Sequence, residues 1–66
     1  MDFAEKARIR LEHWITHNEH HHEEYEMFVD QLEQVGKNES AKYVTEMMEL
    51  TAKGTEYLRK ALKALG

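Results

Sequence analysis

The 66-residue chain contains no cysteine and no proline. The absence of cysteine excludes disulfide bonds and thiolate metal ligands. A domain of this size usually needs disulfides, a metal or a partner chain to be stable. We therefore expect the added stability of this protein to come from oligomerisation or from metal ligands other than thiolate.

The sequence also lacks long apolar runs. The N-terminal stretch MDFAEKARIR has no apolar signal-peptide core, and no later run approaches the length of a membrane span. Together with the absence of cysteine, these features predict a cytoplasmic protein with no membrane partner.

Positive charge is scarce in the first half of the chain. The net charge is −4, with nine acids and three bases in residues 1–35 and four acids and six bases in residues 36–66. Between Leu11 and Val35 there are seven carboxylates and not one Lys or Arg. This pattern does not resemble a basic nucleic-acid-binding surface, and an acidic, histidine-rich segment attracts cations instead.

Apolar residues recur at helical spacing throughout the chain, and no period-two alternation is sustained. Asp2 can cap a first helix, Gly36 suits the position after its end, and Asn38 can cap a second helix. We predict a single domain over residues 1–66, with helix 1 at about 2–35, a loop at about 36–38 and helix 2 at about 39–65. Because the loop is short, the fold class is all-α, an antiparallel two-helix hairpin.

Heptad spacing predicts which residues meet between the two helices. In helix 1 they are Ala4, Ala7, Leu11, Trp14, Asn18, His21, Tyr25, Phe28, Leu32 and Val35, and in helix 2 Ala41, Val44, Met48, Thr51, Thr55, Leu58, Leu62 and Leu65. Folding about Gly36 pairs Phe28 with Met48 and His21 with Thr55. Both rows therefore become polar at the same height.

Helix 2 carries a second apolar row beside the first. It consists of Tyr43, Met47, Leu50, Gly54, Tyr57, Ala61 and Ala64. The two rows together exceed what one neighbouring helix can cover. We expect a homodimer that forms a four-helix bundle, with Gly54 at a close-packing position.

The stretch HNEHHHEE, residues 17–24, holds four of the five histidines, and His13 lies one turn before it. Histidines four residues apart on a helix can bind one metal ion. We predict that His17 and His21 are the main ligands, assisted by His13, His22 or Glu24. In a twofold dimer the His17/His21 pair from each chain would give a four-nitrogen site. The expected cofactor is a divalent transition metal such as Zn, Ni, Co or Fe, and an all-imidazole set also suits Cu.

A metal-free alternative explains the same residues. Asn18, His21, Thr51 and Thr55 would form a hydrogen-bonded polar layer that sets helix register, in an oligomerisation or protein-interaction module. Catalysis has less support, because no cysteine nucleophile, phosphate-binding glycine loop or serine elbow is present. The function we expect is metal storage, delivery or sensing rather than turnover.

The run Leu11-Glu12-His13-Trp14-Ile15-Thr16-His17-Asn18, followed by His21, matches the pattern L-E-H-W-I-x-H-N-x-x-H. It resembles short, uncharacterised prokaryotic helical domains of unknown function. That resemblance covers essentially helix 1, implies a helical hairpin and carries no activity. It draws attention to His13, Trp14, His17, Asn18 and His21, whereas His20 and His22 stand where the pattern is unconstrained.

Overall fold

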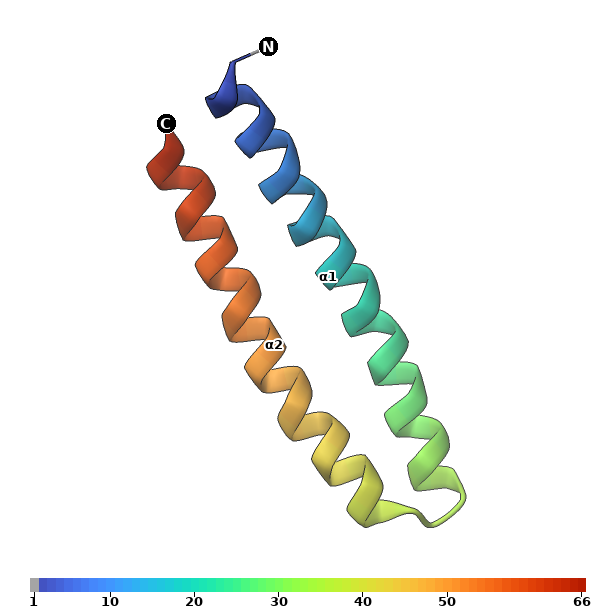
Figure 1. Ribbon diagram of the computed structural model, residues 1–66. Coiled ribbons are helices and arrows are strands. Elements are labelled where there is room, and N and C mark those ends of the chain that lie inside the picture. Colours follow the sequence, from blue (N-terminus) through green and yellow to red (C-terminus); the bar gives the residue numbers. More distant parts are fainter. Residues whose placement is uncertain (1) are drawn as a thin grey trace.

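The computed structural model describes residues 2–66 and contains two helices, α1 (Phe3–Gln34) and α2 (Asn38–Leu65). They run antiparallel and side by side, so both chain ends lie at one end of a rod and the loop lies at the other (Figure 1). The rod measures 51 × 16 × 11 Å. The predicted all-α helical hairpin is confirmed. Neither helix contains a stretch apolar enough to span a membrane.

The ends of α1 follow the predicted signals. The Asp2 carboxylate accepts a hydrogen bond from the backbone N–H of Glu5 at 2.9 Å, which satisfies one free N–H of the first turn. At the other end Gly36 adopts φ +78°, a left-handed conformation that glycine adopts at no steric cost. The N–H of Lys37 then reaches the carbonyl of Leu32 at 2.8 Å, which closes the helix.

The predicted cap of α2 is wrong. Asn38 is the first helical residue, and Lys37 occupies the cap position without a side-chain cap hydrogen bond. The reversal at Gly36 is so short that the carbonyl of Lys37 already accepts the N–H of Ala41, at 3.0 Å. Asn38 therefore already lies inside the helix and cannot act as its cap.

The contact positions of α2 agree with the heptad prediction at all but one place. Ala41, Met48 and Thr55 are buried, and Val44, Leu58, Leu62 and Leu65 are partly buried. The exception is Thr51, which is exposed. A single row of α2 therefore faces α1.

In α1 the heptad prediction holds at six of ten positions. Partly buried as expected are Ala7, Leu11, Asn18, His21, Tyr25 and Leu32, and Ile15, His22 and Val29 lie beside this row. The predicted core residues Trp14, Phe28 and Val35 are instead 47%, 49% and 70% exposed. Ile15 takes a buried position in the contact row, one residue after Trp14, and Trp14 is thereby turned about 100° around the helix.

The hairpin has a thin core. Ile15, Ala41 and Met48 are the buried apolar residues, and no side chain described is completely enclosed. Since apolar burial is the main favourable term in folding, this core supports little stability by itself.

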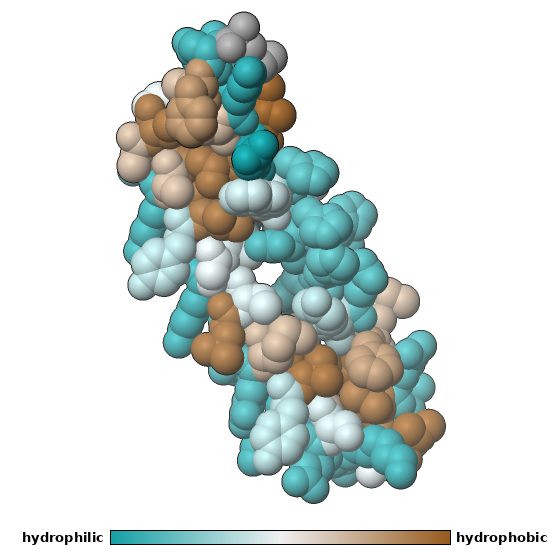
Figure 2. Space-filling view, in the orientation of Figure 1, coloured by the Kyte–Doolittle hydropathy of each residue, from teal (hydrophilic) through white to brown (hydrophobic). Residues whose placement is uncertain are grey.

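The two sides of the hairpin differ in chemistry. On one side a carboxylate oxygen of Glu19 lies 3.2 Å from an Arg59 guanidinium nitrogen, an ion pair between the helices. Helical geometry places Trp14, His17, His21 and Phe28 of α1 on the opposite side, with Tyr43, Met47, Gly54 and Ala61 of α2. We call this second side the open face. Figure 2 shows two apolar areas on the viewed surface, one near the termini and one near the loop, separated by a more hydrophilic band at mid-height.

Candidate functional site

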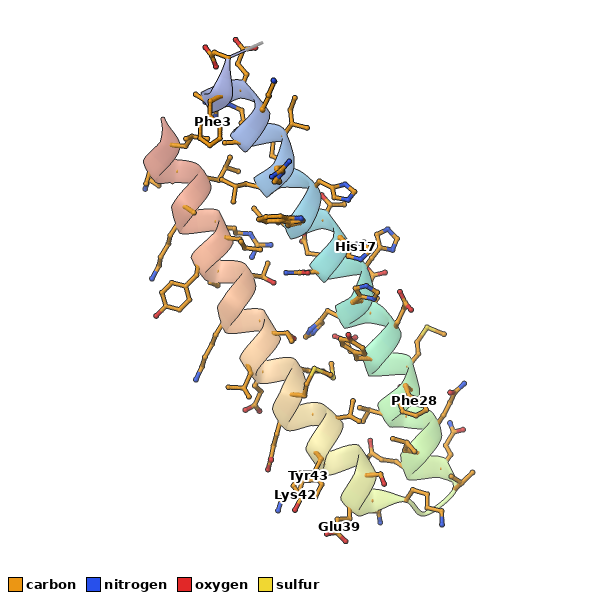
Figure 3. The ribbon with its side chains drawn as sticks, viewed as in Figure 1. Phe3, His17, Phe28, Glu39, Lys42 and Tyr43 are labelled. Atoms are coloured by element: carbon orange, nitrogen blue, oxygen red, sulfur yellow. The ribbon has the colours of Figure 1, made fainter. Side chains whose placement is uncertain are left out.

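His17 and His21 form the central pair of the candidate site. They lie one turn apart on α1, and Figure 3 places His17 near the middle of that helix. Their Nε2 atoms are 2.8 Å apart, and the rings are nearly perpendicular, with an interplanar angle of 87°. His17 is exposed and His21 is partly buried. The helix therefore brings both predicted principal ligands together.

This spacing has two chemical uses. Without a metal, the Nε2–H of one ring donates a hydrogen bond to the Nε2 lone pair of the other. In a tetrahedral zinc site, two imidazole nitrogens that each lie about 2.0–2.1 Å from the ion are about 3.3 Å apart. The two Nε2 atoms are 2.8 Å apart, so the rings would have to separate slightly to share an ion.

Glu24 contacts the other nitrogen of His21. A carboxylate oxygen of Glu24 lies 3.4 Å from His21 Nδ1. A carboxylate at this position favours the tautomer with a proton on Nδ1, which leaves the Nε2 lone pair free for a metal. Glu24 is thus placed to orient a ligand rather than to be one.

The rings on this side of α1 form a column. His13 stacks on His17 and Tyr25 stacks on His21, each with centroids 6.0 Å apart. Stacking restricts the rotation of the two central rings. The sequence analysis missed the role of Tyr25, although its spacing of four residues from His21 was a usable signal.

The structure separates His22 from the other predicted ligands. Its Nε2 atom lies 3.0 Å from a carboxylate oxygen of Glu26, and it lines a cleft between the helices on the Glu19–Arg59 side. His20 is exposed. Among residues 2–66, no three His, Asp or Glu side chains gather closely enough to hold one metal ion. One chain therefore brings together two of the predicted ligands, His17 and His21.

The polar layer exists in a different form from the prediction. The Asn18 side-chain amide donates to Thr55 Oγ1 at 3.3 Å, and the same hydroxyl donates to the carbonyl of Thr51 at 3.0 Å. The predicted pairing of His21 with Thr55 is wrong, since Asn18 faces Thr55. Ile15 and Val29, not Trp14 and Phe28, flank this layer in the contact row, which rotates His21 towards the open face.

Arg59 of α2 lies on the polar side of the hairpin. Its guanidinium contacts Glu19 across the helices and Glu56 on its own helix. An exposed pair of this kind contributes little stability. These contacts make one side of the hairpin polar. The exposed apolar groups described next lie on the other side.

The open face surrounds the histidine pair with apolar groups. Trp14 precedes the pair on α1 and Phe28 follows it, and each is about half exposed. On α2, Tyr43, Leu50 and Tyr57 of the second apolar row are also exposed, at 59%, 68% and 69%. The hairpin does not bury this row itself.

A family model with the description Domain of unknown function (DUF8180) matches residues 7–65. No curated protein and no solved structure matches the chain.

Proposed function

The chain belongs to the family Domain of unknown function (DUF8180), and we propose that it is a small cytoplasmic protein that binds a divalent transition metal. The ligands are His17 and His21, and the role is storage, delivery or sensing. The single observation that carries this proposal is the 2.8 Å separation of the two Nε2 atoms, with His17 exposed and His21 partly exposed.

The donor type selects the class of ion. Imidazole nitrogens bind Zn, Ni, Co, Fe or Cu, whereas Ca²⁺ and Mg²⁺ prefer oxygen donors. The acidic surroundings raise the local concentration of any cation, since residues 11–35 hold seven carboxylates and no Lys or Arg. The accessible position of the pair favours exchange of the ion with solution over turnover of a substrate.

A second candidate function is a metal-free homodimerisation or protein-interaction module. The exposed apolar residues of the open face favour it, because apolar groups gathered on one side of a helical rod mark a contact surface. In this reading the Asn18–Thr55 hydrogen bond sets the register of the helices and the histidines bind no ion.

Metal titration of untagged protein, purified in chelator and then freed of it, separates these candidates. Zn²⁺ or Ni²⁺ at 100 times the dissociation constant should raise the free energy of unfolding by about 2.7 kcal/mol. The change should disappear in His17→Ala and His21→Ala. His20→Ala, which alters an exposed histidine of the same helix, is the matched control. An unchanged melting curve with every first-row ion would leave the interaction module as the function.

A further inference from the structure

We propose that a second copy of this chain completes the metal site. Two hairpins pack open face to open face about a twofold axis that crosses the middle of α1, and each contributes His17 and His21 to one ion with four nitrogen ligands. This inference rests on the proposed metal-binding function and adds the partner and the stoichiometry.

One chain alone provides too few ligands for a complete metal site. Structural zinc sites are almost always four-coordinate. Among the described residues, no third His, Asp or Glu is placed to share one ion with the His17/His21 pair. Because a twofold axis duplicates every residue, a second copy doubles two nitrogens to four.

The His17/His21 pair lies at the middle of α1 along the length of the rod. The midpoint of α1 lies between Asn18 and Glu19, and His17 and His21 stand on either side of it. When two copies of α1 pack antiparallel over their whole length, the midpoint is the place where a residue meets its own copy. With a rise of about 1.5 Å per residue, a pair centred two turns away would be separated from its copy by about 20 Å.

The surface around the histidine pair carries apolar rings that the hairpin does not cover. Trp14 and Phe28 flank the histidines on α1, and both are about half exposed. The hairpin's own core is limited to Ile15, Ala41 and Met48. A second copy seated on the open face would cover these rings and supply the burial that a chain of this size lacks.

Gly54 lies near the middle of α2 on the open face. A Cβ added at Gly54 would meet nothing within 4 Å, so the hairpin itself gives no steric reason for glycine there. Glycine inside a helix is unfavourable compared with alanine. Close approach of the partner's α2 at the same height provides a reason that the single chain does not.

The acidic character of α1 makes the assembly depend on the ion. Antiparallel packing brings together two acidic α1 helices, in which Glu24 lies beside the histidine pair and Glu19 lies on the opposite side of the hairpin. Their mutual repulsion opposes the dimer, and a bound divalent cation at the axis offsets it. Metal binding and dimerisation therefore strengthen each other to the same degree.

The test is sedimentation equilibrium of the full untagged chain, with and without Zn²⁺, together with a zinc titration followed by calorimetry. We expect one zinc per two chains and an increase in dimer affinity of about 5- to 150-fold with zinc. With Co²⁺ as probe, the dimer should show the intense visible absorption of a tetrahedral site. One zinc bound per monomer would overturn the inference and leave the proposed function standing. Absence of zinc binding would overturn both.

Two variants separate ligand loss from loss of contact surface. His17→Ala/His21→Ala should abolish zinc binding and the zinc-dependent gain in dimer affinity while helicity is retained, because His17 is exposed, His21 is only partly buried and alanine favours the helix. Phe28→Ala keeps all four nitrogens and removes an exposed ring, so it should weaken the dimer at every zinc concentration. A dimer equally stable with and without zinc, or unaffected by Phe28→Ala, would contradict the shared site on the open face.

Discussion

The side-chain amide of Asn18 donates a hydrogen bond to Thr55 Oγ1 over 3.3 Å, and this contact joins the middle of α1 to the middle of α2. It lies in a contact row that is otherwise largely apolar. Thr55 is buried, so its hydroxyl needs partners within the protein. The contact therefore fixes the relative height of the helices and, with it, the height of the neighbouring His17/His21 pair.

Asn18→Ala should lower the free energy of unfolding by about 1 kcal/mol. The loss is modest because Thr55 still donates to the carbonyl of Thr51. Urea unfolding in chelator measures it. A double-mutant cycle with Thr55→Val should give a coupling energy, and simple additivity of the two changes would show that the contact does not form in solution.

Ile15→Ala should be the most destabilising apolar truncation in α1, at about 2 kcal/mol or more. Ile15 is 8% exposed and is the buried apolar residue of that helix. Ile9→Ala, at a position that is 53% exposed, is the control and should change stability by less than about 0.5 kcal/mol. Equal effects of the two substitutions in chelator-treated protein would mean that the contact row is misplaced.

Asp2→Ala should lower stability by about 1 kcal/mol, because it leaves the N–H of Glu5 without its capping carboxylate. Lys37→Ala, at the cap position of α2, should be almost neutral because Lys37 makes no side-chain cap hydrogen bond. Thermal unfolding followed by circular dichroism compares them. The reverse order of effects would contradict the observed capping.

Glu24→Gln should weaken zinc binding about tenfold, at the lower end of the range for residues that orient a ligand, because the contact with His21 Nδ1 is long at 3.4 Å. Glu23→Gln removes the same charge from the neighbouring exposed position and serves as the control. Calorimetric titration distinguishes them. An equal loss in both variants would mean that Glu24 acts only through its charge.

Gly54→Ala should affect the free chain and the dimer in opposite directions. In one chain the added methyl meets nothing, so helix propensity should raise the stability of the dilute, metal-free protein by about 1 kcal/mol. In the dimer the same methyl should obstruct the approach of the partner's α2. Dimer affinity that is unchanged or improved would remove Gly54 from the interface.

The sequence predicted the hairpin, the cap at Asp2 and the turn at Gly36, because these depend on local signals such as helical spacing and the left-handed conformation of glycine. It did not predict which α1 residues face α2. Heptad counting placed Trp14 in the contact row as a large apolar residue, whereas the structure places Ile15 there. The difference is one position, about 100° around the helix, and it depends on how the side chains of both helices pack together.

The candidate site, like the fold, could be predicted from the sequence only in part. The four-residue spacing of His17 and His21 predicted that their rings would meet, and they do. The separation of His22 could not be predicted, because it follows from the rotation of α1 that turns His22 towards the cleft. Glu24 was expected as a possible ligand or orienting group, and its contact with His21 Nδ1 supports the orienting role.

The position of both chain ends at one end of a rod 51 Å long has a practical consequence. A fluorescent reporter fused to either end would sit about half a rod length from the histidine pair and would leave it accessible. In an antiparallel dimer, reporters on the two copies would project from opposite tips. Energy transfer between them would then be weak, whereas parallel copies would hold them side by side and give a strong signal.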